Sequence, residues 1–185
     1  MIILFLFLYN IVMINQIVIK GHQDLKTYIL DREPDLIALM RGENKSETLQ
    51  RASQLNCADI TYLLASDIKA QTNGVEEIFA LDGRGPGLTE ADGHLILGVR
   101  TSEGLSSVDG TIWQVFPDEE HISIMGPFQK EEELLATLCQ KYGGEWRKTT
   151  VPENFISTEG AQKSRKLIEG RTRRRNWDND GISLK

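Results

Sequence analysis

Cysteine is scarce in this chain of 185 residues, which contains only Cys57 and Cys139. Neither belongs to a Cys-x-x-Cys pair, and no histidine lies close to either in the sequence, so the spacing typical of zinc sites and redox dithiols is missing. Both cysteines stand in apolar segments with helical spacing. We therefore expect two buried free thiols, which fits a reducing cytoplasm. A disulfide between them is the less favoured alternative, because 82 residues separate the two cysteines.

Long apolar runs are also scarce, and the single candidate is the N-terminal stretch "MIILFLFLYNIVMINQIVIK". It lacks the basic first region and the small-x-small cleavage site of a secretory signal peptide. Residues 1–19 are just long enough for a membrane span, but three side-chain amides interrupt them. We favour a start at Met13, which places residues 1–12 upstream and opens the protein with a strand over Ile14–Lys20. A membrane anchor is the second interpretation and a signal peptide the third.

Local motifs that define an activity are missing as well. No nucleotide-binding glycine fingerprint and no metal-ligand spacing is present, and local spacing suggests no Ser/His/Asp or Cys/His arrangement. We therefore name no cofactor and no metal. What the sequence does contain is a glycine-rich loop in its middle and a cluster of basic residues near its end.

The glycine-rich loop, "LDGRGPGLTEADGH", is a weak candidate for phosphate binding. Backbone N–H groups around Gly83, Arg84, Gly85 and Gly87 could cradle a phosphate, with the arginine as counter-charge. Acidic residues in the same loop would repel an anion, however, and a hairpin that needs positive φ explains the glycines more simply. We therefore prefer a structural role for the glycines and keep phosphate binding as the alternative.

Ionisable side chains surround this loop and are the candidate catalytic residues. Asp82, Asp92 and His94 combine carboxylate and imidazole groups, which are ligands for divalent metals. Their spacing matches no ligand motif, and acidic residues are common in turns for conformational reasons. The loop therefore supports an enzymatic hypothesis only as an alternative.

The hydrophobic pattern predicts an α+β fold. Apolar residues recur at helical spacing up to Gly74, most clearly after Ser46, a suitable N-cap. From residue 75 to residue 128, β-rich runs alternate with turns, which predicts an antiparallel meander of about four strands, one of them over 111–117. A further helix carries Glu131–Glu133 in its first turn and ends at Gly143. We predict a single domain over residues 13–150, in which two or three helices pack on the sheet.

Charge is distributed unevenly along the chain, whose formal net charge is −6. Residues 1–160 carry 13 lysines and arginines against 24 aspartates and glutamates, whereas residues 161–177 carry seven basic residues and one acidic residue. An acidic body with a basic end is typical of proteins that bind a partner through the end. We predict that residues 151–185 form a basic, flexible C-terminal extension, with a helix over Glu159–Gly170.

The basic residues of this extension are the candidate nucleic-acid-binding residues. Arginine contacts phosphates and an indole ring stacks on a base, so we expect RNA or single-stranded DNA as the partner. Two alternatives stay open: the segment folds back on the acidic body, or it contacts anionic lipids together with the apolar N-terminus. The residues are Lys163, Arg165, Lys166, Arg171, Arg173, Arg174, Arg175 and Trp177.

Taken together, these features favour a non-enzymatic binding or regulatory protein of the cytoplasm. Its body would contact a protein partner, and its tail would contact nucleic acid or another acidic partner. The first alternative is an enzyme with a metal- or phosphate-binding site at the Gly83–His94 loop. The second alternative is a small protein that associates with the membrane through residues 1–19.

Overall fold

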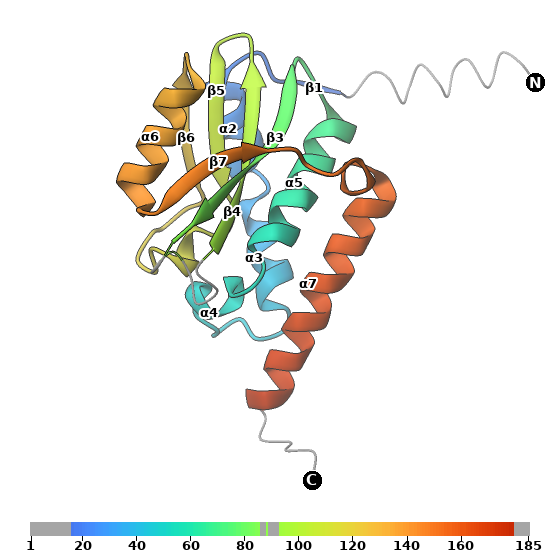
Figure 1. Cartoon of the computed structure of the whole chain (residues 1–185). Coiled ribbons are helices and arrows are strands. Elements are labelled where there is room, and N and C mark those ends of the chain that lie inside the picture. The colour runs from blue at the N-terminus through green and yellow to red at the C-terminus, as the bar shows by residue number, and fades with distance from the viewer. Residues whose placement is uncertain (1–15, 86–87, 89–92, 180–185) are drawn as a thin grey trace, which may run out of the picture.

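A computed structural model describes residues 16–85, 88 and 93–179. In this part of the chain, four α-helices precede the main sheet, one lies between its last two strands in the sequence, and one follows it (Figure 1). The helices are α2 (His22–Leu30), α3 (Glu33–Arg41), α4 (Leu49–Ser53), α5 (Cys57–Gln71), α6 (Glu131–Tyr142) and α7 (Thr158–Asn179), and the short 3-10 helices are η1 (Ile112–Gln114) and η2 (Glu153–Phe155). The strands are β1 (Ile17–Val18), β2 (Thr72–Asn73), β3 (Glu77–Arg84), β4 (Gly93–Thr101), β5 (Gly104–Asp109), β6 (Ser123–Phe128) and β7 (Glu145–Thr149).

The main sheet has five antiparallel strands in the order β6-β5-β4-β3-β7. Strands β3 to β6 follow one another along the sheet, so the predicted α+β class and the predicted meander are confirmed. Strand β7 pairs with the other edge of β3, with Gly83 opposite Trp146. This fifth strand was missed because Trp146 is its only fully apolar residue. Strands β1 and β2 form a separate small parallel pair, so the predicted first strand is shorter than expected.

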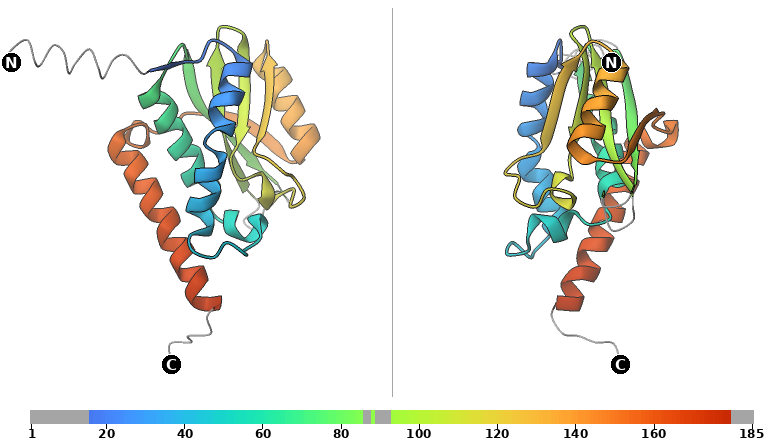
Figure 2. Two further views of the ribbon diagram at one scale, coloured as in Figure 1. Left: turned by 180° about the vertical axis from the view of Figure 1, so that it is seen from behind. Right: turned by 60° about the vertical axis from the view of Figure 1, so that its left-hand side comes forward.

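The helices enclose the sheet and the core forms between them. Helices α2, α3 and α5 lie on the same face of the sheet, which the left panel of Figure 2 shows from behind. Helix α5 packs on β4 and β3 and contributes the fully buried Leu64 and Ile68. Helix α6 packs on β5, β6 and β7 and buries Leu134 and Leu138, so the helix predicted after Glu131 is confirmed. The core is therefore built from both faces of the meander.

Residues 112–114 form a 3-10 turn, so the strand predicted over 111–117 is wrong. Ile112 and Trp113 are consecutive, and both are completely buried. A strand would point them to opposite faces of the sheet, whereas the turn directs both into the core. The Trp113 indole N–H also donates to the carbonyl of Glu119 at 2.7 Å, which holds the turn in place.

The helical region before Gly74 is broken immediately before Cys57. Helix α4 is N-capped by Thr48, whose hydroxyl accepts from the N–H of Arg51 at 3.4 Å, so the prediction that Ser46 caps this helix is wrong. The chain then turns at Leu55, which has a φ of +60° and an exposed side chain. Leucine is disfavoured in this left-handed conformation. The break makes Cys57 the first residue of α5.

Helix α7 lies along α5 in Figures 1 and 2 and also contacts α3. Ser164, Ile168 and Thr172 are buried on the side that faces these helices. The Thr172 hydroxyl donates to the carbonyl of Met40 at 2.9 Å. The expected flexible extension is therefore not confirmed for this segment, because a row of small and apolar side chains on α7 packs against the body. The predicted helix over Glu159–Gly170 is present and longer than expected.

Candidate active site: a Cys57–His94–Asp109 cluster

Cys57 occupies the first position of α5, where a thiol has two sources of stabilisation for its anion. The N–H groups of the first helical turn have no acceptor within the helix, and the helix dipole places partial positive charge there. Cys57 is partly exposed, so the predicted burial is wrong for this residue. It is also wrong for Cys139, which lies on the exposed side of α6. The difference for Cys57 follows from the break before α5, which puts the thiol at a helix end.

The sheet places His94 and Asp109 beside each other. His94 is at the beginning of β4 and Asp109 is the last residue of β5. Antiparallel pairing of these strands, with Leu97 opposite Val108, brings the beginning of one next to the end of the other. Nε2 of His94 lies 2.8 Å from Oδ2 of Asp109, and both side chains are essentially inaccessible to solvent. The pair is therefore a buried imidazole–carboxylate contact.

The Asp109 carboxylate is held by several donors. Oδ1 accepts from the backbone N–H of Thr111 at 2.9 Å, and Oδ2 accepts from the Tyr142 hydroxyl at 3.0 Å as well as from His94. Burial alone would raise the pKa of Asp109, but the charge of His94 and these hydrogen bonds lower it below its usual range. The same environment raises the pKa of Tyr142, through its burial and the neighbouring carboxylate. Asp109 is therefore ionised and fixed in orientation.

Two aromatic rings lie beside the imidazole of His94. Tyr142 and Trp146 contact it, with ring centroids at 6.0 and 6.3 Å. Burial would lower the pKa of His94, but the Asp109 charge and hydrogen bond, with a further contribution from Cys57, raise it well above its usual range. Nε2 faces Asp109, and the buried Nδ1 has no hydrogen-bond partner among the described residues, so it is the ring atom left for the thiol.

The thiol of Cys57 interacts with the charged imidazole and is acidified by it. Burial would raise the pKa of Cys57, but the hydrogen bond and the charge of His94 outweigh burial and lower it. The backbone groups of Leu95 and Ala58 act in the same direction. The cluster therefore favours a thiolate–imidazolium pair, with Asp109 behind the imidazole. A nucleophile, a base and a group that orients the base are the three components of a catalytic triad.

The candidate residues around the glycine-rich loop are only partly brought together. His94 belongs to the cluster above, but Asp82 does not contact it through any described interaction. The Asp82 carboxylate lies 2.9 Å from Nε of Arg84 and 2.8 Å from Nη2 of Arg147, which makes it the centre of a separate ion-pair group. Asp92 lies outside the described residues. In the described part of the chain, no three His, Cys, Asp or Glu side chains gather closely enough to hold a metal.

The glycines proposed for phosphate binding have structural positions where they are described. Gly83 and Arg84 are strand residues of β3, and a Cβ on Gly83 would lie 2.6 Å from the Trp146 ring. Gly85 has a φ of +145° and lies against the backbone of Gly144. These close approaches explain the two glycines by packing and backbone conformation. Gly87 lies outside the described residues.

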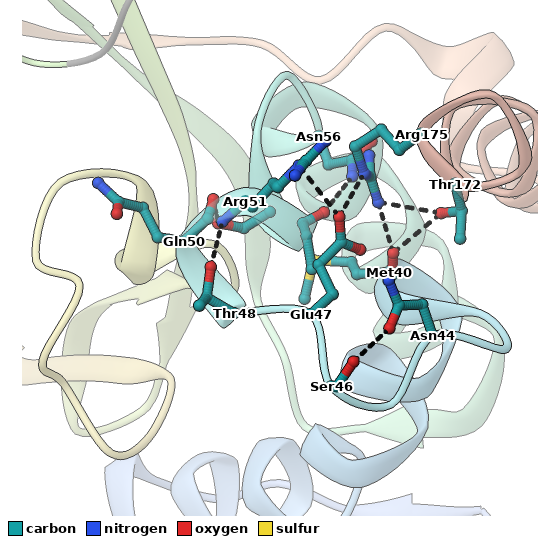
Figure 3. A network of polar contacts seen from close by, with 12 residues as sticks. Met40, Asn44, Ser46, Glu47, Thr48, Gln50, Arg51, Asn56, Thr172 and Arg175 are labelled. Carbon is teal, nitrogen blue, oxygen red and sulfur yellow. Dashed lines mark hydrogen bonds and ion pairs between the residues drawn. The ribbon is translucent and has the colours of Figure 1, made fainter. Parts of the chain in front are cut away.

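The basic residues near the C-terminus divide into two groups on α7. Arg171 and Arg175 face the body, where Arg171 pairs with Asp59. Arg175 pairs with the buried Glu47, as Figure 3 shows. The others point to solvent, and Arg173 lies 3.9 Å from Glu169 on the same helix. The side chain of Trp177 lies outside the described part. The exposed basic residues are Lys163, Arg165, Lys166, Arg173 and Arg174.

Sequence reasoning missed Cys57 and Tyr142 as partners of the His94–Asp109 pair. The available signal was weak: a cysteine directly after Asn56 at the beginning of a helix, and a histidine at the beginning of a strand. Their proximity depends on how α5 packs on β4 and on the pairing of β4 with β5. Neither relation can be obtained from local spacing.

No known protein family, no functionally characterised protein and no solved structure matches this chain. Among the helices that the structure describes, none has both the length and the apolarity needed to cross a membrane. The interpretations of the N-terminus concern residues 1–15, which lie outside the described residues. The functional conclusion therefore depends on the geometry of the cluster alone.

Proposed function

We propose that this protein is a cysteine-dependent acyl-transfer enzyme that acts on amide or ester bonds. The observation that carries the proposal is the buried His94–Asp109 pair, held at 2.8 Å, beside a Cys57 thiol whose pKa is lowered by His94. The three residues come from α5, β4 and β5, and Tyr142 of α6 supports the carboxylate. A purely structural cysteine does not require a charged imidazole backed by a fully hydrogen-bonded aspartate.

Each group has one role in the proposed reaction. The Cys57 thiolate attacks the carbonyl carbon, a C–S bond forms, and the bond to the leaving amine or alcohol breaks. His94 gives the Nδ1 proton to the leaving group, and Asp109 keeps the ring oriented and stabilises its charged form. Water then attacks the thioester, His94 takes a proton from that water, and the acid and the thiolate are released. The N–H groups of the first turn of α5, which have no acceptor within the helix, are the donors proposed for the oxygen that becomes negative.

The two cysteines allow a matched chemical test. Iodoacetamide should alkylate Cys57 faster than Cys139 at about pH 6, although Cys139 is more exposed, because the thiolate is the reacting species. p-Nitrophenyl acetate should leave an acetyl group on Cys57, detected by intact mass, and Cys57→Ser should abolish it while Cys139→Ser does not. Faster labelling of Cys139, or acetylation that survives in Cys57→Ser, would refute the proposal.

Nucleic-acid binding by α7 is a second candidate function, favoured by the basic residues that this helix exposes. The deletion of the whole segment would be a poor test, since Ile168 and Thr172 belong to the packed body. Neutralising Lys163, Arg165 and Lys166 to glutamine leaves those contacts in place. We expect weaker binding to single-stranded RNA and a shallower salt dependence in this variant. Unchanged affinity would count against the hypothesis.

We also propose a cytoplasmic location for the protein, because both cysteines are free thiols.

A further inference from the structure

Arg171 of α7 contacts the two polar residues that enclose Cys57 in the sequence. Its Nη1 donates to Oδ1 of Asn56 at 3.0 Å and to Oδ2 of Asp59 at 2.6 Å, and its Nη2 also bonds to Asp59. Asn56 directly precedes Cys57, and Asp59 lies in the same helical turn. One guanidinium therefore holds both sides of the turn that carries the thiol.

Asn56 links Arg171 to the chain between α4 and α5. Its amide nitrogen donates to the carbonyl of Ala52 at 3.0 Å, while its amide oxygen accepts from Arg171. Asn56 is completely buried, so its amide has to be satisfied by protein groups. The side chain thus connects α4, the first turn of α5 and α7. This connection fixes the chain that turns at Leu55 just before the thiol.

The second inward-facing arginine fixes the position of α7 itself. Arg175 donates to the carbonyl of Met40 at 2.6 Å and lies 3.4 Å from the Glu47 carboxylate, as Figure 3 shows. The Glu47 carboxylate also lies 3.5 Å from Nε of Arg51, and the Glu47 side chain is almost inaccessible to solvent. Thr172 adds its hydrogen bond to Met40. These contacts lock α7 against residues 40–51, so Arg171 has a defined place opposite the first turn of α5.

Asp59 gives this arrangement an electrostatic consequence. Its carboxylate is nearly buried, and burial raises the pKa of Asp59, while the charge and hydrogen bonds of Arg171 act in the opposite direction. An uncompensated carboxylate in the first turn of α5 would disfavour a second negative charge on Cys57. The cation on α7 therefore cancels a charge that opposes thiolate formation.

We propose that Arg171 is a positioning residue for the nucleophile: it holds the first turn of α5 and neutralises Asp59, and in this way it controls the reactivity of Cys57. This inference rests on the proposed function. Other ionisable groups close to the turn stay unchanged in the test below. They are His94 on β4 with Asp109 on β5, Asp82 on β3, Tyr62 on α5 and Lys163 on α7.

The test uses the full chain with Cys139→Ser as background, so that only Cys57 reacts with iodoacetamide. We expect Arg171→Gln to slow alkylation at about pH 6 by about fivefold and to move the pH profile upward, because one nearby charge in a partly solvated site has an effect of this order. Arg171→Lys should restore most of the rate. The matched control is Arg174→Gln, which removes an exposed arginine from the same helix and should leave the profile unchanged.

A double variant separates the electrostatic role from a merely structural one. Asp59→Asn with Arg171→Gln removes both charges, so the profile should return toward that of the parent chain even if the melting temperature stays low. An Arg171→Gln profile that superimposes on the parent overturns the inference, whatever the melting temperature, while a fast parent Cys57 keeps the proposed function intact. A parent Cys57 that reacts no faster than free cysteine overturns the proposed function, and this inference with it.

Discussion

Replacing Asp109 by asparagine tests the cluster most directly. The carboxylate accepts from Nε2 of His94 at 2.8 Å, from the Tyr142 hydroxyl at 3.0 Å and from the N–H of Thr111 at 2.9 Å. Asparagine has the same shape but only one acceptor oxygen, so its NH₂ group must face either the N–H of Thr111 or the two donors on the other side. The substitution also removes the negative charge of Asp109, which balances the positive charge of the buried His94 imidazolium.

The expected loss of stability is large because both partners are buried. Removing one member of a buried ion pair costs about 3–5 kcal/mol, since an uncompensated charge is left in the interior. His94 can lower this cost by losing its proton, so we expect a loss near the lower end, about 3 kcal/mol of the free energy of unfolding. A small domain has about 5–15 kcal/mol in total, so the variant should unfold at clearly lower urea concentration.

The pH dependence provides a second, independent readout. The pKa of Asp109 is lowered on folding, so its contribution is present above the unfolded value near 3.8 and is lost as pH falls through the folded value. The pKa of His94 is raised, so its contribution is present below the unfolded value near 6.5 and is lost as pH rises through the folded value. The pair is therefore most stabilising between these two unfolded values, and Asp109→Asn should lose most there.

The assay is urea unfolding followed by tryptophan fluorescence, to which Trp146 beside the His94 ring contributes. Asp118→Asn is the control, because this aspartate is exposed. We expect the control to unfold like the parent. A loss below about 1 kcal/mol in Asp109→Asn, with the same pH dependence as the parent, would refute a charged buried pair.

Further predictions concern the surroundings of the cluster. Tyr142→Phe should cost about 1.5–3 kcal/mol in urea unfolding, because it removes a hydrogen bond to a buried carboxylate, and a neutral result would contradict that bond. Gly83→Ala should destabilise by about 1–3 kcal/mol, since its Cβ would meet the Trp146 ring, whereas Gly170→Ala on α7 has open space and should stabilise by up to about 1 kcal/mol. Leu55→Gly should raise the melting temperature by relieving about 1 kcal/mol of backbone strain at φ +60°; a lower melting temperature would show that the exposed leucine has a packing role. Asp82→Asn should leave Cys57 alkylation unchanged, and a slower reaction would link the Arg84–Asp82–Arg147 group to the site.

The fold could be predicted where local pattern determines structure. The helix after Glu131 follows from its acidic first turn and glycine stop, and β3, β4 and β6 follow from β-rich runs between turns; all are present. Strand β5 was not predicted, since a strand over 111–117 was expected in its place. The turn at Ile112 and the strand at Trp146 were missed because tertiary packing decides both. In the same way, the charge pattern identified the arginines of α7 but could not show which of them face the body and which face solvent. Only the packing of α7 shows that Arg171 faces the body.

The site was less accessible to sequence reasoning than the fold. His94 was a candidate because it flanks a glycine-rich loop, yet its structural partner is Asp109 and not Asp82. Cys57 was interpreted as a buried thiol because its neighbours are apolar and at helical spacing, whereas its actual exposure depends on where α5 begins and how it packs. Three residues on three elements acquire a common chemistry only when the sheet and α5 are assembled.

The contact between α7 and the first turn of α5 also bears on when the site forms during synthesis. Arg171 and Asn56 are 115 residues apart, whereas His94 and Asp109 are 15 residues apart. A nascent chain can therefore pair its imidazole with the aspartate, and present its thiol, well before the cation opposite Asp59 has been translated. If Arg171 positions the nucleophile as proposed, the thiol would reach its full reactivity only after α7 has been synthesised and has packed on α5.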